Sequence, residues 1–148
     1  AGEVRSARLQ MLASAPDHAV RFPRPVSTRW GYDYWQQLPD GSVVLGGGRD
    51  TAADAEWTAD PAPSEAIQAY LTRMLRERLG VQASVTHRWG ATVSYTTTGR
   101  PIFRDLGGGV RVVGAYSGTG NVVGALLGRA AAQLALTGRS AIADVVPT

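Results

Sequence analysis

The residues best suited to chemistry form a glycine-rich passage from a predicted strand into a predicted helix. The passage is Val112-Val113-Gly114-Ala115-Tyr116-Ser117-Gly118-Thr119-Gly120-Asn121. A helix that begins at such a turn presents free backbone N–H groups and the positive end of its dipole to whatever lies in front of it. Glycines let a planar or anionic ligand approach the backbone closely. The passage therefore predicts a ligand site, and a tight strand-to-helix turn without a ligand is the alternative.

The same glycines are also compatible with a variant dinucleotide-binding fingerprint. Gly118 and Gly120 are followed by Gly124, and Asp144 lies roughly 20 residues further on, where such a motif places a ribose-binding acid. That fingerprint normally opens a parallel sheet of several strands, however. Here the chain has room for at most one further strand, so the context disfavours this interpretation.

The missing residue types exclude several chemistries. All 15 basic residues are arginines and the cysteine count is 0. Schiff-base formation and a lysine general base are therefore excluded, as are thiolate nucleophiles, disulfides and cysteine-ligated zinc. The net charge of +3 is compatible with nucleic-acid binding, but the arginines are scattered. Only Arg73, Arg76 and Arg78 lie close together, and we interpret them as the solvated face of a helix. We predict no metal and no nucleic-acid partner.

Composition indicates one globular unit. The 148 residues are 44% hydrophobic and 18% charged, as in ordinary soluble domains. The sequence contains no apolar run long enough to span a bilayer, and the first residues do not resemble a signal peptide. Together with the absence of cysteine, this favours a cytoplasmic location and no membrane partner.

Two kinds of element must position these residues. Residues 32–38 and 42–45 flank Pro39-Asp40-Gly41 and predict a β-hairpin, with Tyr34 on the opposite face from Asp33 and Trp35. A helix is expected from near Ser64, which can cap it, to a stop at Gly80. Gly46-Gly47-Gly48 is expected to close the hairpin, and a polar loop is expected from there to Pro63.

Further elements extend this pattern. Strands are expected at 7–13, 81–89, 91–96 and 101–103, a buried strand at 110–113, and a second helix at 121–136 that ends at Gly138. The fold class is therefore α+β, with a largely antiparallel mixed sheet and two main helices.

In their order and spacing, several motifs together resemble a known family, the D-amino-acid oxidase-like flavoproteins, which include glycine oxidase and sarcosine oxidase. The motifs run through most of the chain, from about Arg8 to Thr137. They are Tyr32-Asp33-Tyr34-Trp35-x-Gln37-Leu38-Pro39-Asp40-Gly41, Gly46-Gly47-Gly48-Arg49-Asp50, Thr86-His87-Arg88-Trp89-Gly90, Tyr95-Thr96-x-x-Gly99-x-Pro101, Gly114-x-Tyr116-Ser117-Gly118-x-Gly120-Asn121, Gly128-Arg129 and Leu136-Thr137-Gly138.

The resemblance implies that the chain is the C-terminal portion of an FAD-dependent enzyme whose N-terminal Rossmann half, which holds most of the non-covalent FAD, is missing. Residues 1–109 would be a substrate-binding-type sheet domain, and 110–148 the last strand and helix of the FAD domain. It places Ala115, Tyr116, Ser117, Gly118, Thr119, Gly120 and Asn121 against the flavin, and Tyr34 towards the substrate. The helix start would stabilise negative charge at the flavin edge.

The chain departs from the family at positions that recognise substrate. Val93 and Ser117 stand where glycine-oxidase-like members have basic residues, and Val44 and Val122 where sarcosine-oxidase-like members have lysines. Arg49 and Arg88 are the candidate replacements as carboxylate partners. The family's flavin-attaching cysteine, near Val93, has no counterpart, which excludes that covalent link. Tyr34 has a structural alternative as a sheet-filling residue, and His87 is interpreted as a strand-end residue.

The sequence thus predicts part of an enzyme that oxidises the C–N bond of an amine or amino acid by hydride transfer to flavin. We expect a small-molecule substrate, with either oxygen or another electron acceptor. The catalytic residues are unknown. The isolated chain is expected to be inactive and to self-associate through surface left by the missing half. The alternative is a small stand-alone ligand-binding α+β domain without catalytic activity.

Overall fold

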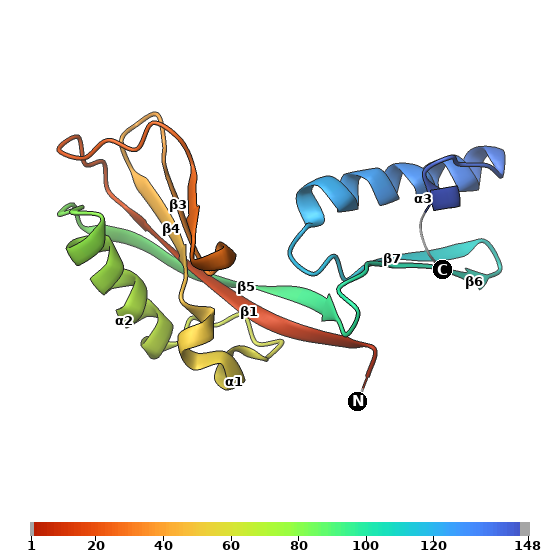
Figure 1. Cartoon of the computed structure of the whole chain (residues 1–148), viewed down its shortest axis with the longest axis horizontal. Coiled ribbons are helices and arrows are strands. Elements are labelled where there is room, and N and C mark those ends of the chain that lie inside the picture. Colours follow the sequence, from red (N-terminus) through yellow and green to blue (C-terminus); the bar gives the residue numbers. More distant parts are fainter. Residues whose placement is uncertain (1, 146–148) are drawn as a thin grey trace. The chain divides into compact units, whose positions relative to one another are not determined.

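A computed structural model describes residues 2–145 and has the predicted α+β fold with antiparallel strand pairs. The chain divides into two compact units (Figure 1). One unit is Ala7–Thr92, and the other is Val93–Thr148 together with Ala1–Ser6. The predicted boundary at residue 110 separates a substrate-binding part from an FAD-binding part. It is a functional boundary, and it stays a prediction.

The Ala7–Thr92 unit is built on a five-stranded sheet in the order β2-β3-β4-β1-β5. Neighbouring strands from β2 to β1 are antiparallel. The strands are β1 (Val4–Ser14), β2 (Val26–Thr28), β3 (Asp33–Gln37), β4 (Val43–Gly47) and β5 (Val85–Thr96). The predicted hairpin is β3–β4. Gly41, with φ +90°, closes its turn and donates a backbone hydrogen bond to Leu38 at 2.9 Å.

One long helical segment covers a face of this sheet (Figure 1). The α-helix α2 (Glu65–Arg73) continues into the π-helical turn η3 (Met74–Arg78), and Gly80 follows with φ +70°, the predicted stop. Apolar side chains from both layers form the core, because both helix and sheet carry an apolar face that must be covered. The core consists of Leu12, Val43, Leu45, Ile67, Leu71, Leu75, Leu79 and Val81.

Two local predictions for this region were wrong. The segment from Gly48 to Pro63 is not simply a polar loop, since it contains the 3₁₀ turn η2 (Arg49–Ala52) and the short helix α1 (Ala53–Glu56). Ser64 stands at the N-cap position of α2 but makes no side-chain capping bond. Its hydroxyl instead accepts a hydrogen bond from the Gln10 amide at 2.7 Å and donates one to Glu56 at 3.0 Å.

The second unit consists of a hairpin and a helix. Strands β6 (Ile102–Gly107) and β7 (Val110–Gly114) pair with each other only, and the π-helical turn η4 (Gly120–Gly124) leads into α3 (Ala125–Thr137). Gly138, with φ +72°, ends α3 as predicted. The 3₁₀ turn η5 (Ala143–Val145) follows.

The prediction that residues 110–113 form a buried strand was wrong. Val110 is 56% exposed and Val112 is 41% exposed. A two-stranded ribbon leaves much of its surface uncovered unless further strands or helices pack on it. Among the described residues, no helix is long and apolar enough to cross a membrane.

Candidate functional site

The predicted strand-to-helix turn is present and its backbone is unusual. Strand β7 ends at Gly114 and the helix begins at Gly120. Between them Ala115 and Ser117 have φ values of +51° and +50°, and Gly118 has φ +91°. Left-handed backbone at non-glycine residues is uncommon and is concentrated at functional sites. The turn brings all seven predicted cofactor-contacting residues, 115–121, into one short segment.

Hydrogen bonds hold this turn in place. The Ser117 amide donates to the Ser94 carbonyl at 3.2 Å, and the Thr96 amide donates to the Ser117 hydroxyl at 3.3 Å. The amide and hydroxyl of Thr119 both donate to the Tyr116 carbonyl, at 2.9 and 2.7 Å. These bonds compensate for the strained φ angles, so the turn is a defined structure.

Two of the glycines lie against the Tyr116 ring. A Cβ atom at Gly120 would lie 3.4 Å from the Tyr116 ring, and one at Gly124 would lie 3.2 Å from it. The ring therefore lies along the first helical turn. The sequence did not indicate this contact, and the interpretation that Gly120 admits a ligand stays a prediction.

The backbone at Gly114 and Gly118 is open. A Cβ at Gly114 would meet nothing within 4 Å, and one at Gly118 would meet only the Tyr95 hydroxyl, at 3.7 Å. Thr119, the N-cap residue, makes no side-chain capping bond, and the first helical turn contains no acidic residue. The helix start therefore keeps N–H donors and positive dipole potential for an outside acceptor.

The dinucleotide-fingerprint alternative lacks its structural context. The strand before the glycines belongs to an antiparallel two-stranded sheet. In the described part of the chain, α3 is followed by the short 3₁₀ turn that contains Asp144, and not by a parallel strand.

Tyr34 lies in the other unit, on β3, beside a surface hollow of about 340 Å³. Gly46 is its partner on β4, and a Cβ there would lie 2.6 Å from the Tyr34 ring. The glycine thus lets the ring lie across the neighbouring strand. Met11 and Val44 also line the hollow, and none of its lining residues is charged.

The candidate replacement arginines are engaged elsewhere. The Arg49 guanidinium lies 5.8 Å from the ring centroid of Tyr32 and 5.1 Å from that of Trp57. Arg88 donates to Gln68 at 2.8 Å and to Thr72 at 3.0 Å. His87 is an exposed strand residue, and no group of metal-ligating side chains occurs among residues 2–145.

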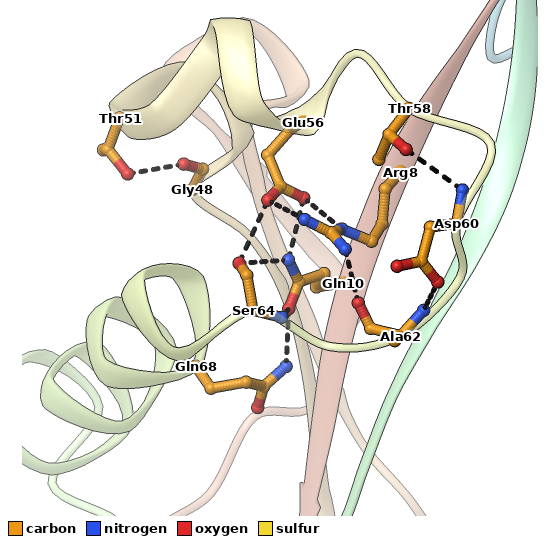
Figure 2. A network of polar contacts seen from close by, with 10 residues as sticks. All are labelled: Arg8, Gln10, Gly48, Thr51, Glu56, Thr58, Asp60, Ala62, Ser64 and Gln68. Carbon is orange, nitrogen blue, oxygen red and sulfur yellow. Dashed lines mark hydrogen bonds and ion pairs between the residues drawn. The ribbon is translucent and has the colours of Figure 1, made fainter.

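Sequence reasoning missed a buried polar network centred on Glu56 (Figure 2). Arg8 binds both carboxylate oxygens of Glu56, at 3.0 and 2.8 Å, and Gln10 and Ser64 donate to the same carboxylate at 2.7 and 3.0 Å. Burial alone would raise the pKa of Glu56, but these hydrogen bonds outweigh it and hold the pKa below its usual value. The sequence did contain a signal for this network. In an alternating strand, Arg8 and Gln10 share a face with the apolar Leu12, which predicts buried polar side chains.

A second missed cluster surrounds Asp33, which is 1% exposed. Its carboxylate accepts hydrogen bonds from Arg29 at 3.0 Å, Tyr70 at 2.8 Å and the Gly48 amide at 3.0 Å. Burial, followed by the hydrogen bond to Asp33, raises the pKa of the Tyr70 hydroxyl. Arg29 also pairs with Asp50. The cluster fixes the start of β3 against α2.

Comparison with known proteins agrees with the resemblance seen in the motifs. A family model described as FAD dependent oxidoreductase matches residues 2–134. The chain therefore belongs to the FAD-dependent oxidoreductase family, and the predicted family is confirmed.

Individual relatives share the fold. A probable oxidoreductase OrdL from Rhizobium meliloti (strain 1021) is 31% identical over 121 residues, which are 80% of this chain and 26% of the relative. L-proline dehydrogenase from P. horikoshii is similar with a TM-score of 0.69 and 15% identity, over 94% of this chain. Glycine oxidase from Geobacillus kaustophilus has a TM-score of 0.68 and 17% identity, over 95%. This chain covers 37% of each of those two structures.

Proposed function

We propose that the protein containing this chain oxidises the C–N bond of an amine or amino acid with bound FAD. Family membership supports FAD as the cofactor, and relatives described as glycine oxidase and L-proline dehydrogenase support a small amine or amino-acid substrate. Because the chain spans 26% of its curated relative and 37% of these structures, the activity belongs to the larger protein.

The residues of the turn fit one edge of a flavin. The ring is planar and its pyrimidine edge carries hydrogen-bond acceptors. The helix start at Gly120 and Asn121 offers uncapped donors, and the open backbone at Gly114 and Gly118 admits a flat group. This open, uncapped turn is the observation that carries the proposal.

Bound FAD would supply the redox step by accepting a hydride. The contribution of this chain is to orient the ring edge and to stabilise negative charge there through the helix-start N–H groups. Tyr34, with the uncharged hollow beside it, would contact the substrate. Most of the cofactor would be held by the N-terminal half that the resemblance predicts.

The exposed apolar surface of the second unit is consistent with the proposal that another part of the protein covers it. Several of its large apolar side chains are 41% to 84% exposed, far more than a self-sufficient domain would leave uncovered. They are Leu106, Val110, Val112, Val122, Leu126 and Leu136. We infer that the isolated chain is catalytically inactive and self-associates. The cytoplasmic location stays a prediction.

A matched pair of glycine substitutions tests the flavin contact in the full-length protein. Gly114→Val and Gly128→Val each place the same side chain where nothing lies within 4 Å in this chain. We expect Gly114→Val to lower the FAD retained per folded protein at least tenfold and Gly128→Val to leave it unchanged. Equal, full FAD content in both purified variants would contradict the proposal.

A further inference from the structure

A second cavity, unrelated to the predicted flavin and substrate contacts, lies behind the sheet of the Ala7–Thr92 unit. Its volume is about 620 Å³, and it is enclosed by β2, β3 and the helical segment α2–η3. Asp33 and Trp35 line it, and strand alternation places both on the face opposite Tyr34. Trp35 also lines the hollow beside Tyr34, so its side chain forms part of both walls, whereas the other residues that line the cavity do not line that hollow.

The wall of the cavity contains an unsatisfied donor. The indole Nε1 of Trp35 is buried and has no hydrogen-bond partner among the described residues. An orphaned buried N–H is rare because it costs the desolvation of the group without compensation. Phe22, Met74 and Leu79 contribute an apolar lining beside it. The donor itself is shielded from the cavity, whose surface at this point is apolar and suits a ligand with an apolar body.

The two sides of the cavity have backbone forms associated with function. On one side η3 is a π-helical turn, a form found frequently at functional sites. On the other, Arg29 and Trp30 are consecutive non-glycine residues with φ +51° and +60°. Strained φ values persist only where surrounding contacts maintain them, and here Arg29 is held by Asp33 and Asp50.

The charged groups around the cavity favour an anion. Asp33 is already satisfied by Arg29, Tyr70 and the backbone, so it does not need a cationic ligand. The other charged side chains that line the cavity are all exposed. Two of them, Arg73 and Arg78, are cationic, and one, Glu77, is anionic. Arg73 lies 6.0 Å from the Tyr70 ring centroid, which leaves its fork of N–H donors available for a carboxylate.

We propose that this cavity binds a small carboxylate with an aromatic or aliphatic body. The body packs against Phe22 and Met74, and the carboxylate is held at the rim by Arg73 and Arg78. This site is independent of the proposed oxidation chemistry.

Fluorine NMR relaxation of three matched ligands tests the site in the purified protein. 4-Fluorophenylacetate, 4-fluorophenylacetamide and 4-fluorophenethylamine carry the same reporter ring and differ in charge. We expect the acid to bind at least tenfold more tightly than the amide, because a charge-assisted bond to arginine is lost in the amide. The amine should bind more weakly still.

Variants assign the binding to this cavity. The double variant Arg73→Gln/Arg78→Gln should weaken binding of the acid about tenfold. Arg24→Gln, at an exposed arginine outside the cavity, is the control for loss of a surface charge and should have no effect. The proposal is overturned if the acid and the amide bind equally, if the amine binds most tightly, if Arg24→Gln weakens binding as much as the rim variant, or if the acid does not bind at millimolar concentration.

Discussion

Replacing Arg8 with methionine removes the cation from the Glu56 network (Figure 2). Methionine retains much of the apolar stem, whereas the carboxylate, on a residue 1% exposed, loses both bonds to the guanidinium and keeps only those from Gln10 and Ser64. Breaking a buried pair in this way costs about 3–5 kcal/mol. Since two donors to the Glu56 carboxylate remain, we expect the free energy of unfolding to fall by about 3 kcal/mol at pH 7.

The measurement is urea unfolding of both proteins at 25 °C. With a slope of about 2 kcal/mol per molar urea, a loss of this size lowers the midpoint by roughly 1.5 M. Arg24→Met is the matched control at an exposed site, where an effect within about 0.5 kcal/mol is expected. The double variant Arg8→Met/Glu56→Leu should recover most of the loss, because replacing a buried ion pair by apolar groups is often close to neutral.

The effect of pH provides a second test of the same reasoning. The folded-state pKa of Glu56 is depressed, so its contribution is complete above the unfolded value and is lost as the pH falls through the folded value. The difference between wild type and Arg8→Met should therefore shrink in acid, where the carboxylate of the variant takes up a proton. A loss below 1 kcal/mol at pH 7, or one that grows in acid, would refute the account of the network.

Three further outcomes are expected. Gly46→Val should destabilise by about 1–3 kcal/mol and shift the Tyr34 ring, since its Cβ would lie 2.6 Å from that ring, and thermal melting with Tyr34 NMR shifts will check both effects. Backbone hydrogen bonds from Gln82 and Ala83 lower the pKa of Asp17, so wild type should lose stability relative to Asp17→Asn as the pH falls below about 4, which acid titration of unfolding will measure. The purified 148-residue chain should be colourless and bind added FAD weakly at most, and tight stoichiometric binding in a fluorescence titration would contradict this.

Local sequence rules predicted much of the fold. The Pro39-Asp40-Gly41 turn, the helix stops at Gly80 and Gly138 and the turn before Gly120 depend on backbone preferences that act over a few residues. The position of the turn that is the candidate site was therefore predictable.

Features that depend on distant partners were not predictable. Ser64 does not cap α2, since its hydroxyl accepts from Gln10 and donates to Glu56, and the Asp33 cluster requires Tyr70 from a helix 37 residues away. The strand at 110–113 looked buried from its valines, yet its burial depends on neighbours that residues 2–145 do not supply. The contact of Tyr116 with the first helical turn was not foreseen either, and the role of Gly120 at the flavin stays a prediction.

Amide hydrogen exchange in the full-length flavoprotein tests the central claim most directly. If the helix start binds the flavin edge, the backbone amides of Gly118, Gly120 and Asn121 should exchange at least tenfold more slowly with FAD bound than in the apoprotein. The amide of Gly138, at the other end of α3, should serve as an internal reference with unchanged exchange. Equal exchange of the 118–121 amides in both forms, with FAD bound stoichiometrically, would contradict the assignment of this turn as the flavin contact.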